Sequence, residues 1–561
     1  MAMLLLLSCE DILDIKPTTF ISDAVIWDDK KLIDQFVANI YGSMISGFER
    51  AQFGNNGMGG NFDSGTDDFD SKWDAETNQF NTGEITAMSC PFINQIWTTG
   101  YSTIRKCNLL IEGIDKVNDK VLNETERKRY KAEAYFLRAF CYFDLAKTFG
   151  KAPLIVHAQK IDEDLLVAPT DFEGLINFIV SECDQYAGDL YSHKSIPYSE
   201  RGHATKGAFM ALKARALLYL ASPLNNPSNE EQRWAVAAEA ADDVRKLNDY
   251  SLYTVGNTPY YSLFFDKSVS NNEFIFEKRY HFNDTYHNIH MLWILDPVDR
   301  GGWNGLYPTH NLAEAYEMKN GLFINDPESG WALADEKVFS NRDSRFEQSL
   351  LWHGCIWETT TIYTHTNTTG GGHGNSQNSI YKARCGYGLR KFLEDYGDHS
   401  AGLLYGSPPV WAQDNSWPYF RYAEVLLNYA EAKNESLGAP DQSVYDAVNE
   451  VRGRAGQPDL PAGLTKDQMR ARIKNERRVE LVLEEHRFFD LRRWKDVDKL
   501  RETVKGIFVY YNPDYGGTGG TEYPAGNSYV IRDIEQRIFN ESLYYLPIPQ
   551  GEIDKNPLLA Q

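Results

Sequence analysis

The chain has 561 residues, which is long enough to bury a large core in several domains or in one body built of repeats. Its 57 basic and 79 acidic residues give a formal net charge of −22. Such a field repels nucleic acid phosphates and anionic lipid headgroups. Composition therefore excludes nucleic acid as a partner and favours neutral or cationic ligands.

The amino terminus carries a targeting pattern. The first ten residues, MAMLLLLSCE, join an apolar run from Leu4 to Leu7 to the small Ser8 and then Cys9. This is the pattern of a bacterial lipoprotein signal, in which cleavage before Cys9 leaves a thiol that carries lipid. It predicts a signal remnant at residues 1–9, ending in lipidated Cys9, and a tether at 10–27. The alternative is a short buried apolar segment with an incidental cysteine.

Beyond this start, no apolar run approaches the roughly 20 residues that span a bilayer, so membrane contact requires an anchor. The six other cysteines show no CxxC motif and no metal-ligand spacing, and neither a metal nor a cofactor is expected. Several lie in apolar helical stretches, where a thiol packs as a small hydrophobic group. Because their number is even, a disulfide between two of them is an alternative in an exported protein.

Helical periodicity dominates residues 28–250. Within 28–48, the apolar Leu32, Phe36, Ile40 and Met44 recur every four residues, which predicts an amphipathic helix. The same reasoning predicts four further helices, the second of which stops at Gly150. They span residues 91–115, 124–149, 203–222 and 230–247.

Residues 417–500 return to helical periodicity, with helices predicted at 419–437 and 442–455. Small alanines stand beside large Tyr, Leu and Phe side chains in these pairs of helices, which is typical of tetratricopeptide-like stacking. We therefore predict a mainly α fold in which degenerate tetratricopeptide-like repeats, 28–250 and 417–500, form a scaffold.

Between residues 251 and 416 this periodicity fades. Gly, Asn, Thr, Pro and aromatic residues dominate, as in DRGGWNGLYP at 299–308. So much loop in a compact protein is usually functional, and we predict that 251–416 is a ligand-binding insertion carried on the rigid scaffold. Residues 501–561 are predicted to be a loop-rich segment packed on that scaffold.

Several distant segments resemble one family, the SusD/RagB outer-membrane nutrient-binding lipoproteins. Residues 475–494, NERRVELVLEEHRFFDLRRW, resemble its most recognisable helix, and Tyr545–Gln550 with Asn556 and Pro557 resemble its carboxyl terminus. The start, CEDILDIKP at 9–17, and HNLAEAY at 310–316 agree as well. The resemblance therefore spans nearly the whole chain in the same order.

The charged segment 475–494 invites a catalytic interpretation, but its spacing favours a structural one. Three pairs of opposite charge are three residues apart, so each pair can meet on a helix surface. These pairs are Arg477 with Glu480, Glu484 with Arg487, and Asp490 with Arg493. We call residues 475–494 the clasp and predict that it pins the fold together.

No enzyme motif emerges. A glycosidase needs two carboxylates at a defined separation, and with 79 acidic residues composition cannot single out a pair. The Gly-rich stretch 516–520 lacks the Lys and Ser/Thr of a phosphate loop, and no GxSxG is present. We predict a non-enzymatic protein, with a surface glycan hydrolase as a less favoured alternative.

Two polar, aromatic segments suit carbohydrate. Sugar rings expose an apolar C–H face ringed by hydroxyls, so a site needs flat aromatic platforms with polar partners. The early loop 61–74 and the stretch 291–307 supply both. We predict Trp73, Trp293, Trp303 and Tyr307 as platforms and Asp67, Asn304 and Arg300 as polar partners, with Trp352, Trp357, Trp411 and Trp417 in reserve. The alternative for each Trp is a buried packing role.

The family resemblance implies an arc of aromatics above the repeats, a lipid anchor at the cell surface, and delivery of glycan to a SusC-like, TonB-dependent outer-membrane transporter. It also leaves a peptide or glycopeptide ligand open. A purely structural adaptor that binds peptides in a concave solenoid face is a further alternative, but it leaves the long aromatic loops unexplained.

Overall fold

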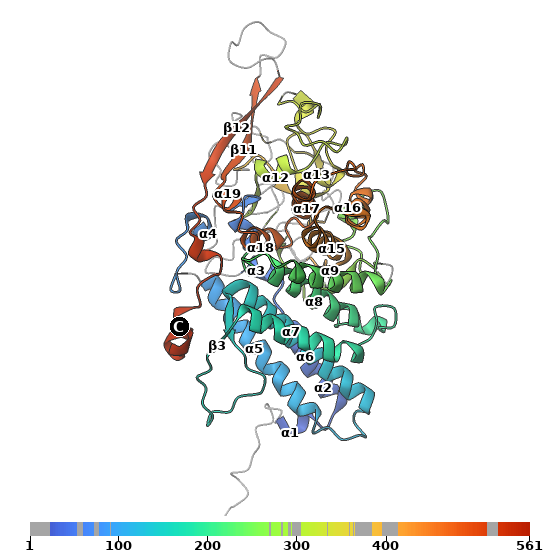
Figure 1. Cartoon of the computed structure of the whole chain (residues 1–561), viewed down its shortest axis with the longest axis vertical. Helices are drawn as coiled ribbons and strands as arrows, with labels where there is room; N and C mark the ends of the chain where they lie inside the picture. Colours follow the sequence, from blue (N-terminus) through green and yellow to red (C-terminus); the bar gives the residue numbers. More distant parts are fainter. Residues whose placement is uncertain are drawn as a thin grey trace, which may run out of the picture.

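In the computed structural model the described residues are 23–52, 60–71, 78–89, 91–268, 271–281, 284–289, 293, 305–333, 335–357, 360–362, 364, 384–394, 413–512 and 526–560. They form a mainly helical molecule in which helices fill the lower half and a long hairpin projects at the top (Figure 1). The predicted mainly α fold is confirmed.

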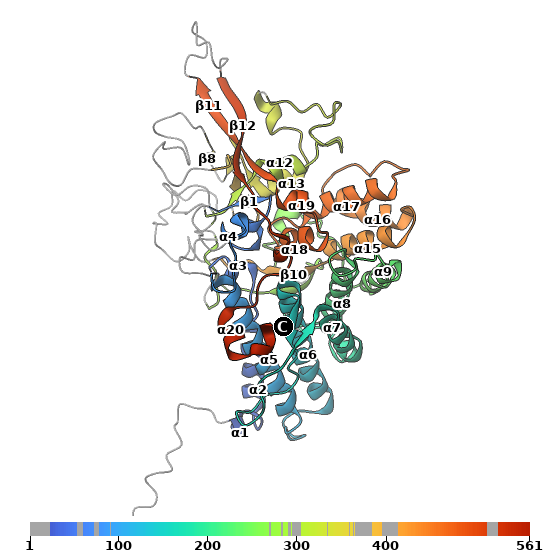
Figure 2. The ribbon, with the colours of Figure 1, turned by 60° about the vertical axis from the view of Figure 1, so that its left-hand side comes forward.

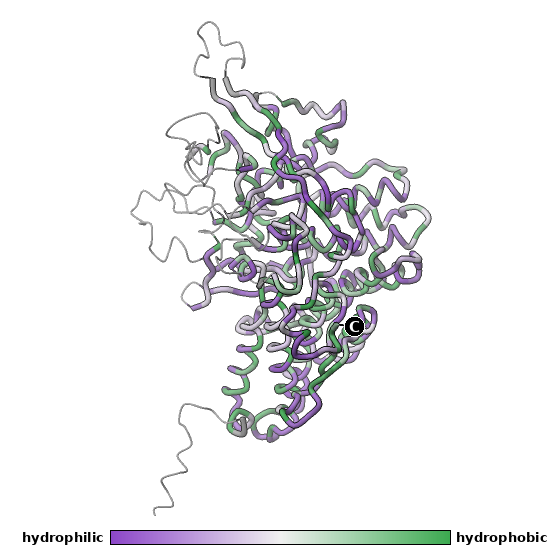
Figure 3. The backbone as a smooth tube through the Cα atoms, turned by 90° about the vertical axis from the view of Figure 1, so that its left-hand side faces the viewer, coloured by the Kyte–Doolittle hydropathy of each residue, from purple (hydrophilic) through white to green (hydrophobic). Residues whose placement is uncertain are grey.

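Five long helices stack in chain order. They are α5 (Pro91–Ile114), α6 (Glu124–Phe149), α7 (Phe172–Tyr186), α8 (Lys206–Ala221) and α9 (Glu231–Lys246), and each packs against the next. This is the helix-hairpin stacking of tetratricopeptide-like repeats. Four were predicted; α7 adds to them, and Asp171 caps it by accepting a hydrogen bond from Gly174 N at 2.8 Å. In Figure 3 hydrophobic and hydrophilic segments alternate along these helices, as expected of amphipathic repeats.

Local sequence signals explain where α6 begins and ends. Asn123 and Glu126 form a capping box at its start, satisfying backbone N–H groups that have no partner in the helix. Gly150 ends it with φ of 74°, a conformation that side chains disfavour. A Cβ there would also lie 2.6 Å from Tyr545 Cδ2, so glycine both stops the helix and admits the carboxyl-terminal segment.

The repeat stack continues across the insertion. Helix α15 (Tyr422–Ser436) packs against α8 and α9, and α16 (Gln442–Arg454) packs against α15. Helix α15 begins three residues later than predicted because Trp417–Arg421 forms β10, which pairs with β4 (Phe274–Lys278). The two predicted scaffold segments are therefore one continuous stack in space.

The clasp is broken in the middle. Helix α17 (Lys466–Glu480) ends at Glu480, and α18 (His486–Arg493) begins after a turn in which Leu483 and Glu485 have φ of 62° and 61°. Such angles cost free energy in residues other than glycine and persist only where surrounding contacts hold them. The prediction of one continuous helix is wrong here.

The described strands pair as six two-stranded antiparallel sheets. The longest is the hairpin of β11 (Thr503–Asn512) and β12 (Gly526–Gln536). The others are β1 (Phe69–Asp70) with β5 (Tyr307–Pro308), β2 (Lys151–Pro153) with β3 (Pro169–Asp171), β4 with β10, β6 (Leu350–Leu351) with β9 (Gly388–Leu389), and β7 (Ile356–Trp357) with β8 (Thr360–Thr361). Short helices complete the fold, among them α1 (Asp23–Ile26), α2 (Lys30–Gly42), α3 (Gly47–Arg50), α4 (Asn78–Thr82), α10 (Pro259–Ser262), α12 (His310–Ala315), α13 (Ser344–Ser349), α19 (Val497–Leu500) and α20 (Gln550–Lys555).

An aromatic cluster joins the early chain to the insertion. Phe48 is fully buried and meets the rings of Trp417, Phe392 and Trp293 with centroids 5.0, 5.1 and 6.2 Å away. A Cβ on the adjacent Gly47 would lie 2.2 Å from Trp417, so only glycine lets α3 approach this ring. The insertion is therefore packed into the core of the scaffold.

Candidate ligand-binding site

Three of the seven predicted ligand residues are described, and all three lie in the interior. Trp293 and Tyr307 are 0 % exposed and Asp67 is 1 % exposed. Trp293 packs edge-on against Phe48, and Asp67 is ion-paired inside the fold. These side chains pack or pair within the protein rather than face a ligand, which corrects the prediction for the three. Outside the described residues lie Trp73, Arg300, Trp303 and Asn304, as does Cys9.

The structure nevertheless brings the two predicted segments together. Strand β1, from the early loop, pairs with β5, from the insertion, and the Ser71 Oγ donates a hydrogen bond to the Gly305 carbonyl at 2.9 Å. Trp73 follows Ser71 by two residues in the sequence, and Asn304 directly precedes Gly305. We call this the β1–β5 junction. Figure 2 places β1, α4 and β8 on the opposite side of the molecule from α7, α8, α9 and α16.

The clasp anchors the junction through buried arginines. Arg487 makes a two-pronged contact with Asp67, with N···O distances of 2.9 and 2.8 Å. Arg478 donates to Asp68 from its Nε at 2.6 Å. From the insertion side, Thr309 Oγ1 donates to the Asp67 carbonyl at 2.6 Å. The acidic early loop is therefore a structural element that holds β1 against β5.

Electrostatics keep Asp67 charged in this position. Burial opposes ionisation, but the guanidinium groups of Arg478 and Arg487 outweigh burial and hold the pKa of Asp67 well below its usual range. A carboxylate in this state is not a proton donor near neutral pH. Asp67 therefore serves to fix the loop.

Further contacts reach the junction from distant parts of the chain. Arg384 pairs with Asp70 at 2.8 Å, and Arg537 donates to the Phe69 carbonyl at 2.7 Å. The backbone N–H of Glu485, at the broken turn of the clasp, donates to Asp63 at 3.0 Å. The left-handed turn at 483–485 thus serves the junction directly.

The clasp is structural, but two of its three predicted ion pairs do not form. Asp490 and Arg493 pair at 2.8 Å as predicted. Arg477 contacts Asp490 instead of Glu480, and Glu484 pairs with residues of other elements. The helix ends at Glu480, so Glu484 and Arg487 do not lie on one helix surface. The charged side chains of the clasp point into the interior instead, where Glu484 meets Arg421 and Lys391.

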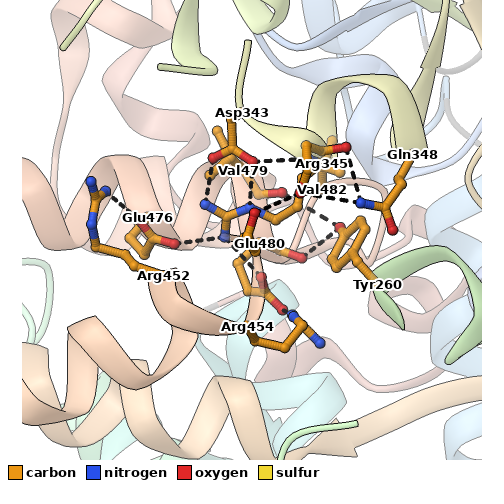
Figure 4. A network of polar contacts seen from close by, with 12 residues as sticks. Tyr260, Asp343, Arg345, Gln348, Arg452, Arg454, Glu476, Val479, Glu480 and Val482 are labelled. Carbon is orange, nitrogen blue, oxygen red and sulfur yellow. Dashed lines mark hydrogen bonds and ion pairs between the residues drawn. The ribbon is translucent and has the colours of Figure 1, made fainter. Parts of the chain in front are cut away.

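Glu480 is the centre of a buried ionic network (Figure 4). It contacts Arg345 at 2.9 Å and Arg421 at 2.6 Å, and it also pairs with Arg454. Among the described residues the connected network is balanced, with six basic and six acidic side chains. They are Arg345, Arg421, Arg452, Arg454, Arg472 and Lys391 with Glu273, Glu317, Asp343, Glu476, Glu480 and Glu484. Pairing of this kind is what makes burial of so many charges tolerable.

Among the reserve tryptophans, Trp357 and Trp417 are 1 % and 2 % exposed and belong to the core. Trp411 lies outside the described residues. Trp352 is partly exposed and lines a cleft of about 820 Å³. Tyr529 of β12 lines the same cleft. No sequence signal indicated that Tyr529 is close to Trp352, because the two are 177 positions apart in the sequence and meet only through the folded chain, where both contact Phe339.

One group of side chains has the composition of a metal site. Glu133, Glu200 and His203 present ligand atoms within 4.8 Å of one another. Arg129, however, contacts both Glu133 and Glu200 at 2.7 Å. A guanidinium in this position neutralises the carboxylates that would attract a cation. We interpret the group as an ion-pair cluster between α6 and the start of α8.

This cluster predicts a pH-dependent contribution to stability. His203 Nδ1 lies 2.9 Å from a Glu133 oxygen, and its ring stacks on Tyr41. Burial lowers the pKa of His203, but the hydrogen bond and charge of Glu133 outweigh burial and raise it. A raised folded-state pKa stabilises the fold at pH below the unfolded-state value of about 6.5, and this contribution is lost as pH rises through the folded-state pKa.

We therefore expect the stability deficit of a His203→Gln variant to be largest near pH 6 and to shrink toward pH 9. Urea unfolding of both proteins across this range measures the deficit. A deficit that stays constant with pH would show that His203 contributes only through packing.

Five of the cysteines lie in the part of the chain that the structure describes. Cys107, Cys141, Cys183, Cys355 and Cys385 are buried free thiols, so no disulfide forms among these five. Within the described ranges, no helix combines the length and apolar character needed to cross a bilayer.

Comparison with known proteins decides the family. A family model described as "SusD family" matches residues 262–561, more than half of the chain. The chain belongs to the SusD family. A second model, described as "Starch-binding associating with outer membrane", matches residues 11–180 of this SusD-family protein. The resemblance drawn from the clasp and the carboxyl terminus is thus confirmed.

Similar proteins match along nearly their whole length. A SusD-like protein of Formosa agariphila, P38, is 24 % identical over 89 % of this chain and 91 % of its own. Another, P25 of the same organism, is 23 % identical over 99 % and 95 %. A solved structure described as a SusD-like carbohydrate binding protein from Bacteroides fragilis superposes with a TM-score of 0.77 at 26 % identity, covering 95 % of this chain and 99 % of that chain.

Proposed function

We propose that this protein binds oligosaccharide or polysaccharide at the cell surface without cleaving it, and delivers it to a SusC-like, TonB-dependent outer-membrane transporter. The observation that carries the proposal is the β1–β5 junction. It joins the two segments whose sequences carry aromatic and polar residues suited to sugar rings, Trp73 in one and Trp303 with Asn304 in the other. Membership of the SusD family and the carbohydrate-binding relative support it.

Localisation forms part of the proposal. The lipoprotein pattern ending at Cys9 and the family description of outer-membrane association support a protein held at the outer membrane by lipid. A tethered binder that holds several units of one glycan chain gains avidity from each added contact. Weak binding at each site is then sufficient, and release toward the transporter stays fast. The repeat stack, with its extended surface, is the proposed docking side.

Two buried carboxylates of the clasp, Glu480 and Glu484, do not have the properties of a general acid. Glu480 and Glu484 are fully engaged by arginines or lysine. These contacts outweigh burial and hold the pKa of each group below its usual range. A general acid in glycoside hydrolysis needs a raised pKa instead.

The test is calorimetry of the full chain against a panel of polysaccharides, with product analysis on the same mixtures. We expect binding without cleavage, and binding about three- to tenfold weaker in a Trp303→Ala variant, because one stacking platform is lost. A matched control is Tyr198→Ala, whose ring is 67 % exposed on the repeat scaffold. Failure to bind any glycan would favour peptide or glycopeptide ligands, and cleavage would favour a hydrolase.

The transporter part of the proposal needs a separate measurement. In cells that carry its native transporter, the full chain should co-purify with that transporter, and a Cys9→Ser variant should leave the membrane fraction. A chain that stays in the membrane fraction after Cys9→Ser would contradict the lipid anchor.

A further inference from the structure

The cleft beside Trp352 has the dimensions of a ligand site. Its volume of about 820 Å³ falls within the range of about 300–1,000 Å³ typical of small-molecule pockets. Its described walls come from four parts of the chain: Lys319, the segment 339–347, which includes the start of α13, residues 352–354 with Thr361, and Tyr529 of β12. Tyr529 stands opposite Val509 of β11 in the projecting hairpin that these two strands form (Figure 1).

Two partly exposed aromatic side chains, Trp352 and Tyr529, offer flat surfaces in this cleft. Phe339 connects them, with its ring centroid 6.3 Å from Trp352 and 5.8 Å from Tyr529. Trp352 also packs on the buried Phe346 at 5.1 Å. The platforms therefore have a fixed orientation before any ligand arrives, which reduces the entropy lost on binding.

Polar groups surround the platforms. Asn341, Lys319 and Glu347 line the cleft and are exposed, and Ser340 is partly exposed. Asn341 has φ of 56°, a conformation that asparagine tolerates better than most residues. Amide, hydroxyl, ammonium and carboxylate groups beside flat rings are the combination that pairs with sugar hydroxyls while a ring stacks.

The charge of the cleft argues for an uncharged ligand. Its lining carries two basic groups, Lys319 and Arg342, and two acidic groups, Asp343 and Glu347. Arg342 is buried and donates to the backbone carbonyls of Ala313 and Tyr316. The balance gives no net field to select a uronate or a sulfated sugar.

The cleft stands on the ionic network of the clasp. Asp343 lies in the cleft wall and pairs with Arg345 at 2.7 Å, and Arg345 in turn contacts Glu476 at 2.6 Å and Glu480 at 2.9 Å (Figure 4). This attachment fixes α13, and with it Phe346, beneath the platforms.

The cleft is distinct from the β1–β5 junction. Tyr387 lies between the two, with its ring 6.1 Å from Phe339 of the cleft and its hydroxyl 2.8 Å from His310 Nδ1. Tyr387 is 1 % exposed, so a buried side chain separates the two places. A sugar unit bound in the cleft is therefore a different unit from one bound at the junction.

We propose that this cleft is a second carbohydrate-binding site, selective for uncharged pyranose units, in which Trp352 and Tyr529 stack on sugar rings and Asn341 bonds to hydroxyls. The inference rests on the proposed glycan-binding function but not on the residues at the β1–β5 junction. Two separate sites on one rigid body would let the protein hold a long glycan at two points and release it stepwise.

The experiment compares single and combined substitutions in the full chain. Calorimetry with starch, laminarin, xylan and mannan identifies a glycan that the unchanged protein binds. The affinity for that glycan is then measured in Trp352→Ala, Tyr529→Ala, Trp303→Ala and a triple variant, with Tyr198→Ala as the exposed-ring control. Because Trp352 also packs on Phe346, the folding of each variant is checked by thermal unfolding. Tyr529→Ala, on the hairpin, leaves the contact between Trp352 and Phe346 intact.

We expect Trp352→Ala and Tyr529→Ala each to weaken polysaccharide binding about three- to tenfold, with residual binding in Trp303→Ala that disappears in the triple variant. A charged polysaccharide such as pectin should not displace the neutral glycan from the cleft. Unchanged affinity in both cleft variants, with folding intact, overturns the second site while leaving the proposed function standing. Absence of glycan binding in the unchanged protein overturns both.

Discussion

Replacing Glu480 by alanine should lower the free energy of unfolding by about 3–5 kcal/mol, the usual cost of removing one partner from a buried ion pair. Glu480 is 0 % exposed and contacts Arg345, Arg421 and Arg454. Its loss leaves the balanced network with one excess positive charge in the interior. Chemical denaturation followed by tryptophan fluorescence measures the change.

The matched control for Glu480 lies on the same helix. Asp467, in the first turn of α17, has a side chain that is 85 % exposed and pairs only with Arg470 among the described contacts. Asp467→Ala should change stability by less than about 1 kcal/mol. Equal effects of the two substitutions would contradict the central role of Glu480.

Removing Asp67 should also destabilise the fold, by about 3 kcal/mol or more, because Arg487 would lose its bidentate partner while it remains buried. Since the folded-state pKa of Asp67 is lowered, the stabilisation is present above the unfolded-state value of about 3.9 and is lost as pH falls through the folded-state pKa. Urea unfolding of Asp67→Ala at neutral and acid pH measures both effects, and the deficit should shrink in acid.

This second prediction separates two roles for Asp67. A structural anchor lowers stability when removed, whereas a ligand contact lowers glycan affinity and leaves stability unchanged. Asp119, whose side chain is 90 % exposed and pairs with Arg127, supplies a control in which an exposed aspartate is removed. Stability of Asp67→Ala equal to that of Asp119→Ala would restore the ligand-contact interpretation.

Local signals predicted the scaffold well. Helices α5, α6, α9 and α16 begin and end within about a residue of their predicted limits because capping residues, glycines and apolar spacing are local properties of the sequence. The misplaced start of α15 has a non-local cause, since residues 417–421 pair with β4. Propensity yields to tertiary pairing there.

The candidate site was harder to predict for two physical reasons. A tryptophan such as Trp293 has the same side chain whether it packs in a core or stacks on a sugar, so its role depends on exposure that the sequence does not encode. Charged residues such as Arg487 and Asp67 are normally assigned to the surface, yet here they are buried as a pair separated by 420 positions. The described parts of the segments 61–74 and 291–307 meet where β1 pairs with β5, but the contacts that join them were not foreseen.

The wide sequence separation of the junction contacts dictates an order of assembly. Helices α5 to α9 pack against chain neighbours and can acquire their structure early, since contacts close in sequence form fastest. The loop that holds Asp67 and Asp68 cannot make its ion pairs until Arg478 and Arg487 have joined the folded structure. The carbonyl of Phe69 likewise has to meet Arg537, near the end of the chain. We therefore expect the face that carries the proposed glycan site to form last, and a chain truncated before Arg537 to fold its repeats but leave that face incomplete.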